Sequence, residues 1–317
     1  GPEVVAKALS SPCLTNSTQP LVIGSPSALQ RALDLVRSSR VICQVADIAE
    51  IPQNDAIPVL GADEPSLNDL PYGQTCPEAG DAAVRWLKHA AELAIAGTVQ
   101  AITTAPINKE AAYLAGCEHV GHQEIFQAMT GAPDVVTMLV TPGLRVVHLS
   151  THHSLSRACG LVTRDNVLAK LRLTKEFFAR HGIHDPRIGV SALNPHGGES
   201  GLIGDEETIA ISPAVADARE EGISAAGPIP ADTVFNKAIE GEFDVVLAMY
   251  HDQGHIPIKV HNWASSTTMN VGLPFLRTSV DHGTAFDIAG QGIADATGMI
   301  EAINVASAIV STGRLPN

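Results

Sequence analysis

The sequence predicts an α/β protein whose sheets are largely parallel and covered on both faces. Short apolar runs rich in β-branched residues alternate with longer amphipathic runs, as in "PLVIG" followed by "SALQRALDLVRSSR". This alternation is typical of strand–helix units. Hydrophobic residues make up 45% of the chain and charged residues 17%, which fits strands buried on both faces. The 317 residues exceed one simple core, so we expect two lobes or one large domain.

The individual elements follow from these runs in chain order. Apolar runs predict strands at 20–24, 40–45, 57–60, 98–106, 135–141, 144–151, 187–192 and 244–250. Amphipathic runs predict helices at 27–40, 78–96, 164–181, 205–220 and 297–312. Pro142 and Gly143 join two adjacent strands, and 54–75 is a Pro-, Asp- and Gly-rich loop. The chain opens directly in a helix-like "PEVVAKAL", which leaves open a further strand upstream.

Composition excludes several classes of function. The net charge of −14 argues against a nucleic-acid partner, because phosphate backbones need a basic surface. Five scattered cysteines without a CxxC pair indicate reduced thiols in a cytoplasm. No apolar run reaches the roughly 18 residues of a membrane span. We therefore expect a cytoplasmic protein that does not bind membranes or nucleic acids.

Three predicted strands end in histidine. "RVVHLSTHHS" ends in His152 and His153, "IGVSALNPHGGES" ends in His196, and "VVLAMYHDQGH" ends in His251 and Asp252. Each histidine follows an apolar strand and is expected to precede a turn. Ligands collect beyond the carboxyl ends of parallel strands, and three imidazoles with open positions are typical of a catalytic metal site. The alternative for any one histidine is a hydrogen-bonded residue at a strand end.

Two carboxylates accompany these histidines. Asp232, in "GPIPADTVF", is expected at a helix N-cap. Asp252 directly follows His251. Near a metal ion, both would balance its charge and orient its ligands. The glycines of "NPHGGESG" would let the backbone approach a ligand closely, or form a plain tight turn.

The stretch "HGTAFDIAGQGIADAT" resembles the adenine-side cofactor loop of the isocitrate and isopropylmalate dehydrogenase superfamily. No GxGxxG follows a strand, so the common dinucleotide motif is absent. Together with "LSTHHSL", "LNPHGGESGLIGDEE", "MYHDQGHIPIK" and "GLPFLRTSVDHGTA", the chain resembles the 4-hydroxythreonine-4-phosphate dehydrogenase family of vitamin B6 biosynthesis. "THHSL" and "DQGHIPIK" look closer to its branch acting on 4-phospho-threonate or 4-phospho-erythronate.

The resemblance implies an isocitrate/isopropylmalate dehydrogenase-like fold with two α/β lobes and a central cleft. Roughly 1–120 plus 262–317 would form the cofactor-side lobe, and roughly 121–261 the metal and dimerisation lobe. It also implies NAD, a divalent metal, and a homodimer in which one of the metal ligands comes from the partner subunit. Imidazole ligands favour Zn2+ or Co2+ over Mg2+, which prefers oxygen.

The resemblance also implies roles for individual residues. The metal ligands would be His152, His196 and His251. The acid or base would be Lys259, Asp232 or Asp252. Substrate would contact His122, Gln123, Lys259, Thr268, Asn270 and Arg277. NAD would contact His282, Gly283, Thr284, Ala285, Asp287, Ile288, Ala289 and Gly290. Lys109 also matches a family lysine. Gln123 replaces a frequent threonine, and an expected asparagine falls on Thr268, two positions before Asn270.

The expected reaction is oxidation and decarboxylation of a phosphorylated four-carbon 3-hydroxy acid. 4-Hydroxythreonine 4-phosphate would give 3-amino-2-oxopropyl phosphate. The alternative substrates, 4-phospho-D-threonate and 4-phospho-D-erythronate, would give dihydroxyacetone phosphate. Gln123 mildly favours a further alternative, a non-phosphorylated cyclic diol acid. Two alternatives lie outside this class: a three-histidine metal lyase, which would need no nicotinamide, and a catalytically silent metal-binding or structural protein.

Overall fold

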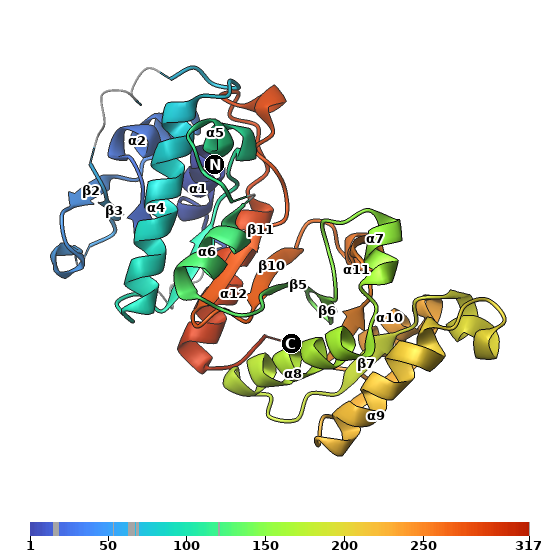
Figure 1. The fold of residues 1–317 in the computed structure, drawn as a ribbon. Coiled ribbons are helices and arrows are strands. Elements are labelled where there is room, and N and C mark those ends of the chain that lie inside the picture. Colours follow the sequence, from blue (N-terminus) through green and yellow to red (C-terminus); the bar gives the residue numbers. More distant parts are fainter. Residues whose placement is uncertain (15–18, 53, 63–66, 68–69, 120, 317) are drawn as a thin grey trace. The chain divides into compact units, whose positions relative to one another are not determined.

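A computed structural model describes residues 1–317 except 15–18, 53, 63–66, 68–69, 120 and 317. The chain forms two compact units (Figure 1). Unit 1 comprises Gly1–Pro133 and Leu273–Ser311, and unit 2 comprises Asp134–Gly272 and Thr312–Asn317. Both units are therefore discontinuous in sequence. The division lies near residues 133 and 272, whereas the sequence suggested about 120 and 262.

Unit 1 combines parallel strands with covering helices. Its elements are α1 (Pro2–Leu9), β1 (Val22–Ile23), α2 (Pro26–Leu35), β2 (Ile42–Val45), η1 (Ile48–Glu50), β3 (Ile57–Leu60), α4 (Pro77–Ile95), β4 (Ala101–Thr104), α5 (Lys109–Leu114), α6 (His122–Thr130), β11 (Leu276–Val280), η4 (Phe286–Ile288) and α12 (Thr297–Thr312). Strands β1 and β2 both pair in parallel with β3. Strand β11 pairs in parallel with β4, so two segments far apart in sequence build one edge.

Unit 2 is built on six strands in the order β10-β5-β6-β9-β7-β8. Its elements are β5 (Val136–Thr141), β6 (Leu144–His148), α7 (Leu155–Gly160), α8 (Arg164–Arg180), β7 (Ile188–Ser191), η2 (Pro195–Gly201), the π-helix η3 (Glu207–Ile211), α9 (Ser212–Glu220), β8 (Ala225–Ile229), α10 (Ala231–Ile239), β9 (Val245–Ala248), α11 (His251–His261) and β10 (Thr267–Val271). Strands β6, β9, β7 and β8 run parallel, while β5 is antiparallel to both neighbours. The predicted α/β class, with parallel and mixed sheets, is confirmed.

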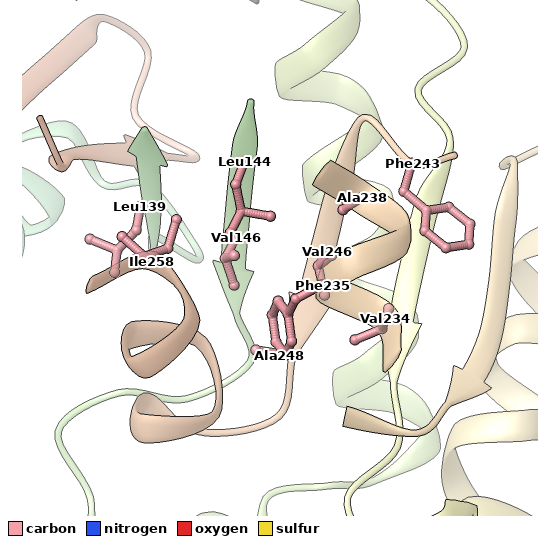
Figure 2. Packing of buried hydrophobic residues seen from close by; sticks show 10 residues of the cluster. All are labelled: Leu139, Leu144, Val146, Val234, Phe235, Ala238, Phe243, Val246, Ala248 and Ile258. Atoms are coloured by element: carbon pink, nitrogen blue, oxygen red, sulfur yellow. The ribbon is translucent and has the colours of Figure 1, made fainter. Parts of the chain in front are cut away.

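The core of unit 2 shows how β6 is placed. Leu144 and Val146 of β6 join side chains of β5, β9, α10 and α11 in one apolar cluster (Figure 2). Successive side chains of a strand point to opposite faces. Val147 therefore points away from this cluster, yet it is also fully buried, so helices cover both faces. The same alternation places His148 on the face of Leu144 and Val146, toward the cluster that includes α11.

Most predicted elements are confirmed within a few residues. Helix α12 has the predicted bounds, and the strands joined at Pro142 and Gly143 form an antiparallel pair. The expectation that His251 precedes a turn is wrong, because α11 begins at His251 itself. Strand β8 was not predicted, since it contains Pro228; it lies at the sheet edge, where a missing N–H is tolerated. Among the described residues, no helix is long and apolar enough to cross a membrane.

Candidate active site

The three histidines predicted as metal ligands all lie beyond strand ends of unit 2. His152 follows β6 after three residues, His196 lies in η2 after β7, and His251 is the first residue of α11 after β9. Strands β6, β9 and β7 are parallel neighbours, so their carboxyl ends lie at one edge of the sheet. The topology therefore carries all three histidines to one edge, as the sequence indicated.

Two of these histidines are oriented by carboxylates. The Nδ1 of His251 donates to Oδ1 of Asp252 over 2.7 Å. The Nδ1 of His196 donates to Oε1 of Glu199 over 3.0 Å. A neutral imidazole that donates from Nδ1 keeps a lone pair on Nε2, the atom that would bind a metal ion. This carboxylate–histidine arrangement fits Zn2+ or Co2+ chemistry.

The loop that carries His196 has an unusual backbone. All residues from His196 to Gly201 have positive φ, including the non-glycine residues His196 (54°), Glu199 (46°) and Ser200 (60°). Side chains with a Cβ are disfavoured there by roughly 1–2 kcal/mol each. Such strain persists only where surrounding contacts fix the backbone. Glu207 fixes the backbone directly before this loop, at Leu193 and Asn194.

Glu207 is a buried carboxylate at the start of η3. Its Oε1 accepts the backbone N–H of Leu193 at 2.8 Å and of Asn194 at 2.7 Å. Its Oε2 accepts from the Asn194 side-chain amide at 2.9 Å. A Cβ on Gly198 would lie 2.7 Å from the same Oε2, so the loop can close over the carboxylate only with glycine there. Glu207 thus ties the end of β7 to the His196 loop.

Replacing Glu207 with leucine should lower the free energy of unfolding by about 3 kcal/mol, because buried donors lose their acceptor at about 1–3 kcal/mol each. Urea unfolding followed by circular dichroism measures this loss. Glu206→Gln is the matched control. Glu206 also accepts from the Asn194 amide, at 2.6 Å, and a glutamine keeps an acceptor oxygen. A control loss as large as that of Glu207→Leu would contradict the special role of Glu207.

Within one chain, the three imidazoles do not form a closed metal site. The ring centroids of His152 and His251 are 6.2 Å apart. In the part of the chain that the structure describes, no three His, Cys, Asp or Glu side chains gather closely enough to hold a metal ion. A site made from these histidines therefore needs either a rearrangement or a ligand from a second copy.

Asp232 and Lys259, two predicted acid–base residues of unit 2, lie on different helices. Asp232 is not an N-cap, since α10 is capped at Pro230; it is an exposed first-turn residue that accepts from the Thr233 hydroxyl at 3.0 Å. Lys259 lies on α11 and donates to Ser266 Oγ over 3.1 Å, with its Nζ 4.7 Å from the Trp263 ring centroid.

Thr268 and Asn270 point to the same face of β10, two residues apart, and Asn270 is buried. Along α11, His251, His255 and Lys259 follow at spacings of four and form one stripe.

Unit 1 holds a second cluster, at the N-terminus of α6. Arg277 of β11 is only 5% exposed, and its Nε and Nη2 donate to Thr104 Oγ1 at 3.1 and 2.5 Å. Burial lowers the pKa of Arg277 to about 9, against a raising effect of Glu124. His122 begins α6, and its pKa is lowered to about 3 by burial and then by the positive charges of Arg277 and Lys109.

We call Thr104, Lys109, His122, Glu124 and Arg277 the α6 cluster. A buried guanidinium and a nearby ammonium attract anions, and so does the N-terminus of a helix. The neutral His122 can donate a hydrogen bond without adding charge. The cluster brings together two predicted substrate residues, His122 and Arg277. Gln123 follows as the second residue of α6.

The low pKa of His122 has a measurable consequence for stability. The unfolded chain binds a proton near pH 6.5 and the folded chain only near pH 3, so stability falls as pH drops between these values. Between pH 8 and pH 5 the loss from this group should be about 2 kcal/mol. Asparagine does not titrate, so the pH dependence of urea unfolding in His122→Asn should be shallower by that amount. Equal slopes for both proteins would contradict the buried, neutral state of His122.

The predicted cofactor loop connects β11 to α12 and is anchored at its end. The N–H of Ala294 donates to Glu3 Oε1 at 2.8 Å, and Lys7 Nζ donates to the carbonyl oxygens of Gly292 at 2.9 Å and Ala294 at 2.6 Å. Gly290 has φ 79°, and a Cβ there would lie 2.5 Å from the Tyr72 ring. Four of the predicted NAD contacts are exposed: His282, Gly283, Ala285 and Asp287. An anchored loop with an exposed tip fits a cofactor-binding segment.

Three residues that make long-range contacts in the structure, Glu207, His148 and His255, were not predicted to be functional. Glu207 looked like one of several acidic residues in "GDEE". His148 looked like part of an apolar strand, and His255 like the end of a turn. Each gains its role from a contact with a segment distant in sequence, which local patterns do not reveal. The only signal was the presence of an imidazole within an otherwise apolar strand.

A parallel α/β sheet with histidines at its strand ends, and a second unit with a buried cation, are features typical of enzymes that bind small molecules. Comparison with known proteins agrees. The chain matches the family described as "Pyridoxal phosphate biosynthetic protein PdxA" over residues 16–306. It belongs to this family, as its sequence motifs predicted.

The relatives of this chain are dehydrogenases. It is 43% identical to the D-threonate 4-phosphate dehydrogenase of Salmonella typhimurium, covering 96% of this chain and 94% of that protein. It is 41% identical to the 4-hydroxythreonine-4-phosphate dehydrogenase of Trichlorobacter lovleyi, covering 98% and 94%. The crystal structure of 4-hydroxythreonine-4-phosphate dehydrogenase from Klebsiella pneumoniae is similar, with a TM-score of 0.90 at 39% identity, covering 97% and 95%. The chain is thus an enzyme of a dehydrogenase family.

Proposed function

We propose that this enzyme oxidises and decarboxylates a phosphorylated four-carbon 3-hydroxy acid, using NAD+ and a divalent metal ion. The observation that carries the proposal is the orientation of His251 and His196 by Asp252 and Glu199. This leaves the Nε2 lone pairs available at one edge of the sheet. His152 lies at the same edge and would be the third ligand.

A bound metal ion would lower the pKa of the substrate hydroxyl and stabilise the negative charge that develops on loss of CO2, while NAD+ would accept the hydride. The chain itself would bind and orient the substrate. In unit 1, Arg277 and Lys109 would hold anionic groups, and neutral His122 would donate a hydrogen bond. The exposed tip of the loop 282–290 would contact NAD. We therefore propose that unit 1 is the cofactor side and unit 2 the metal side.

Proton transfer is assigned to Lys259 rather than to an aspartate. Asp252 accepts from His251, which gives it an orienting role. Asp232 is exposed and bound to Thr233. Lys259 is partly buried on the same stripe of α11 as His251, two turns away. Thr268 and Asn270 would contact substrate from β10.

The incomplete set of imidazoles within one chain supports a homodimer in which each metal site takes a ligand from both subunits. All five cysteines are free thiols, which supports function in the reducing cytoplasm.

Two substrates differ only in the group on C2. 4-Hydroxythreonine 4-phosphate carries an amine, and D-threonate 4-phosphate carries a hydroxyl. Relatives named for each substrate cover nearly the whole chain at 41% and 43% identity. Both phosphorylated acids are therefore candidate substrates of this enzyme.

The test is a substrate panel with NAD+ and added Zn2+, Co2+ or Mg2+, read at the absorbance of NADH. We expect metal-dependent NADH formation from at least one of the two phosphorylated acids, and none from the dephosphorylated acids. NADH formation that persists in excess chelator would overturn the metal assignment. Activity with neither acid would overturn the substrate class.

A further inference from the structure

His255, one turn after His251 on α11, lies directly against the His251 ring. The two ring centroids are 3.6 Å apart and the planes differ by 12°, so the rings are stacked. The Nδ1 of His255 also contacts the backbone carbonyl of His251 at 3.0 Å. A movement of the His251 ring toward His255, or a tilt of its plane, would therefore have to displace His255.

A second buried histidine fixes His255 in turn. The Nε2 of His148 lies 3.1 Å from Nδ1 of His255, and Nδ1 of His148 lies 3.3 Å from the carbonyl oxygen of Thr137. Carbonyl oxygens only accept. The proton of His255 is therefore on Nδ1, where the His251 carbonyl and His148 Nε2 share it. His148 must then carry its own proton on Nδ1, toward Thr137.

This hydrogen-bond chain allows one set of neutral tautomers. His148 is 1% exposed, and burial lowers its pKa to about 3, so it stays neutral and its Nε2 remains an acceptor. In His255 the same assignment leaves Nε2 unprotonated. The carbonyls of Thr137 and His251 thus set the direction of the hydrogen bond between His255 and His148.

The backbone is shaped around this contact. Gly254 precedes His255, and a Cβ at Gly254 would lie 2.3 Å from His148 Nε2 and 2.8 Å from Val146 Cγ1. Helix α11 can approach β6 this closely only with glycine at this position. Two leucines at 148 and 255 would fill similar volume without burying ring nitrogens. The cost of burying them indicates a role for the pair beyond filling the core.

We infer that His148 and His255 form a positioning pair that holds the His251 ring in the orientation needed to bind the metal ion. The inference rests on the proposed metal site. Neither residue of the pair is assigned as a metal ligand. Asp252 holds His251 from one side through Nδ1, and His255 supports the ring by stacking.

The test measures Co2+ affinity of the full-length protein from the visible absorption of bound Co2+. His255→Leu and His148→Leu should each weaken binding about 10- to 100-fold, the usual effect of losing a group that orients a ligand. The Co2+ affinity of the double variant should lie within about threefold of the affinity of the weaker-binding single variant, because both residues act through one hydrogen bond. Losses that multiply would overturn the coupling.

Two conservative variants separate positioning from packing. In His148→Gln the amide oxygen can take the place of Nε2 and accept from His255, so binding should recover to within about threefold of wild type. In His148→Asn the amide takes the place of Nδ1 and does not replace the Nε2 acceptor, so Co2+ binding should stay weak. Equal affinities in the two variants would overturn the acceptor role even if His148→Leu did not fold. His261→Gln is the matched control on the same helix, since His261 Nε2 lies 3.0 Å from the carbonyl oxygen of Pro142, and this variant should bind Co2+ as wild type does.

Failure of the inference is distinguishable from failure of the proposed function. If wild type binds no Co2+, or if His251→Ala binds it unchanged, the metal site and the positioning role both fall. If His251→Ala loses binding while His148→Leu and His255→Leu keep it, only the positioning pair falls. Nitrogen-15 NMR of the metal-free protein gives an independent readout. It should show His255 protonated on Nδ1 alone, and protonation on Nε2 would overturn the assignment.

Discussion

Replacing His251 with alanine is expected to reduce metal-dependent NADH formation at least roughly 1,000-fold, because the proposed three-histidine site would lose one ligand. His251 is partly exposed and starts a helix, so the fold should be retained. Asp252→Asn should reduce the rate less, about 10- to 100-fold, since it removes the group that orients the ligand and not the ligand itself. Initial rates with Zn2+, Co2+ and Mg2+, together with circular dichroism, measure both effects.

His153 provides the control for His251→Ala. It is an exposed histidine next to the predicted ligand His152, at the same edge of the sheet, and it has no assigned role. His153→Ala should keep its rate within about twofold of wild type, as surface substitutions usually do. If His251→Ala retained more than a tenth of the wild-type rate, His251 could not be a metal ligand in the reaction.

Replacing Arg277 with methionine is expected to lower kcat/KM at least about 100-fold, or about 3 kcal/mol of transition-state binding, chiefly through KM. The reason is the burial of its guanidinium, which can bind an anion with little competition from water. The kcat/KM of Arg277→Lys should lie between those of wild type and Arg277→Met, because an ammonium keeps the charge but lacks the planar fork of donors. Steady-state kinetics with the phosphorylated substrate measure the change.

Stability should respond to Arg277→Met in the opposite direction from activity. A buried cation is costly, and an apolar side chain of similar length removes that cost. The melting temperature without substrate should therefore stay equal or rise. Arg85→Met, at an exposed ion pair of the same unit, should change neither kinetics nor melting temperature appreciably. A large loss of stability in Arg277→Met would show that Arg277 supports the fold and not the substrate.

The parts of the fold that depend on local pattern could be predicted. The 3.6-residue periodicity of 297–312 gave helix α12 its bounds, and Pro142 with Gly143 marked the turn between β5 and β6. The fold class followed from alternating strands and helices. Residues 277, 122 and 251 were singled out because motifs surround them, and the structure places two of them together in the α6 cluster.

The parts that depend on long-range contacts could not be predicted. His148 and His255 are 107 residues apart, and no local signal connects them. Two glycines after His196 indicated a tight turn, but not six consecutive residues with positive φ. Directly before this run, Glu207 from the following helix accepts the N–H groups of Leu193 and Asn194. Of the consecutive acidic residues Asp205, Glu206 and Glu207, only Glu207 is buried, and the sequence alone does not distinguish it from the other two.

The discontinuity of both units imposes an order on folding during synthesis. Strand β4 must wait for β11, more than 170 residues later, before its parallel pairing can form. Unit 2 is nearly complete by Gly272. On the ribosome, the middle of this polypeptide should therefore fold first, while residues 1–133 remain an incomplete unit that a nascent-chain chaperone could bind.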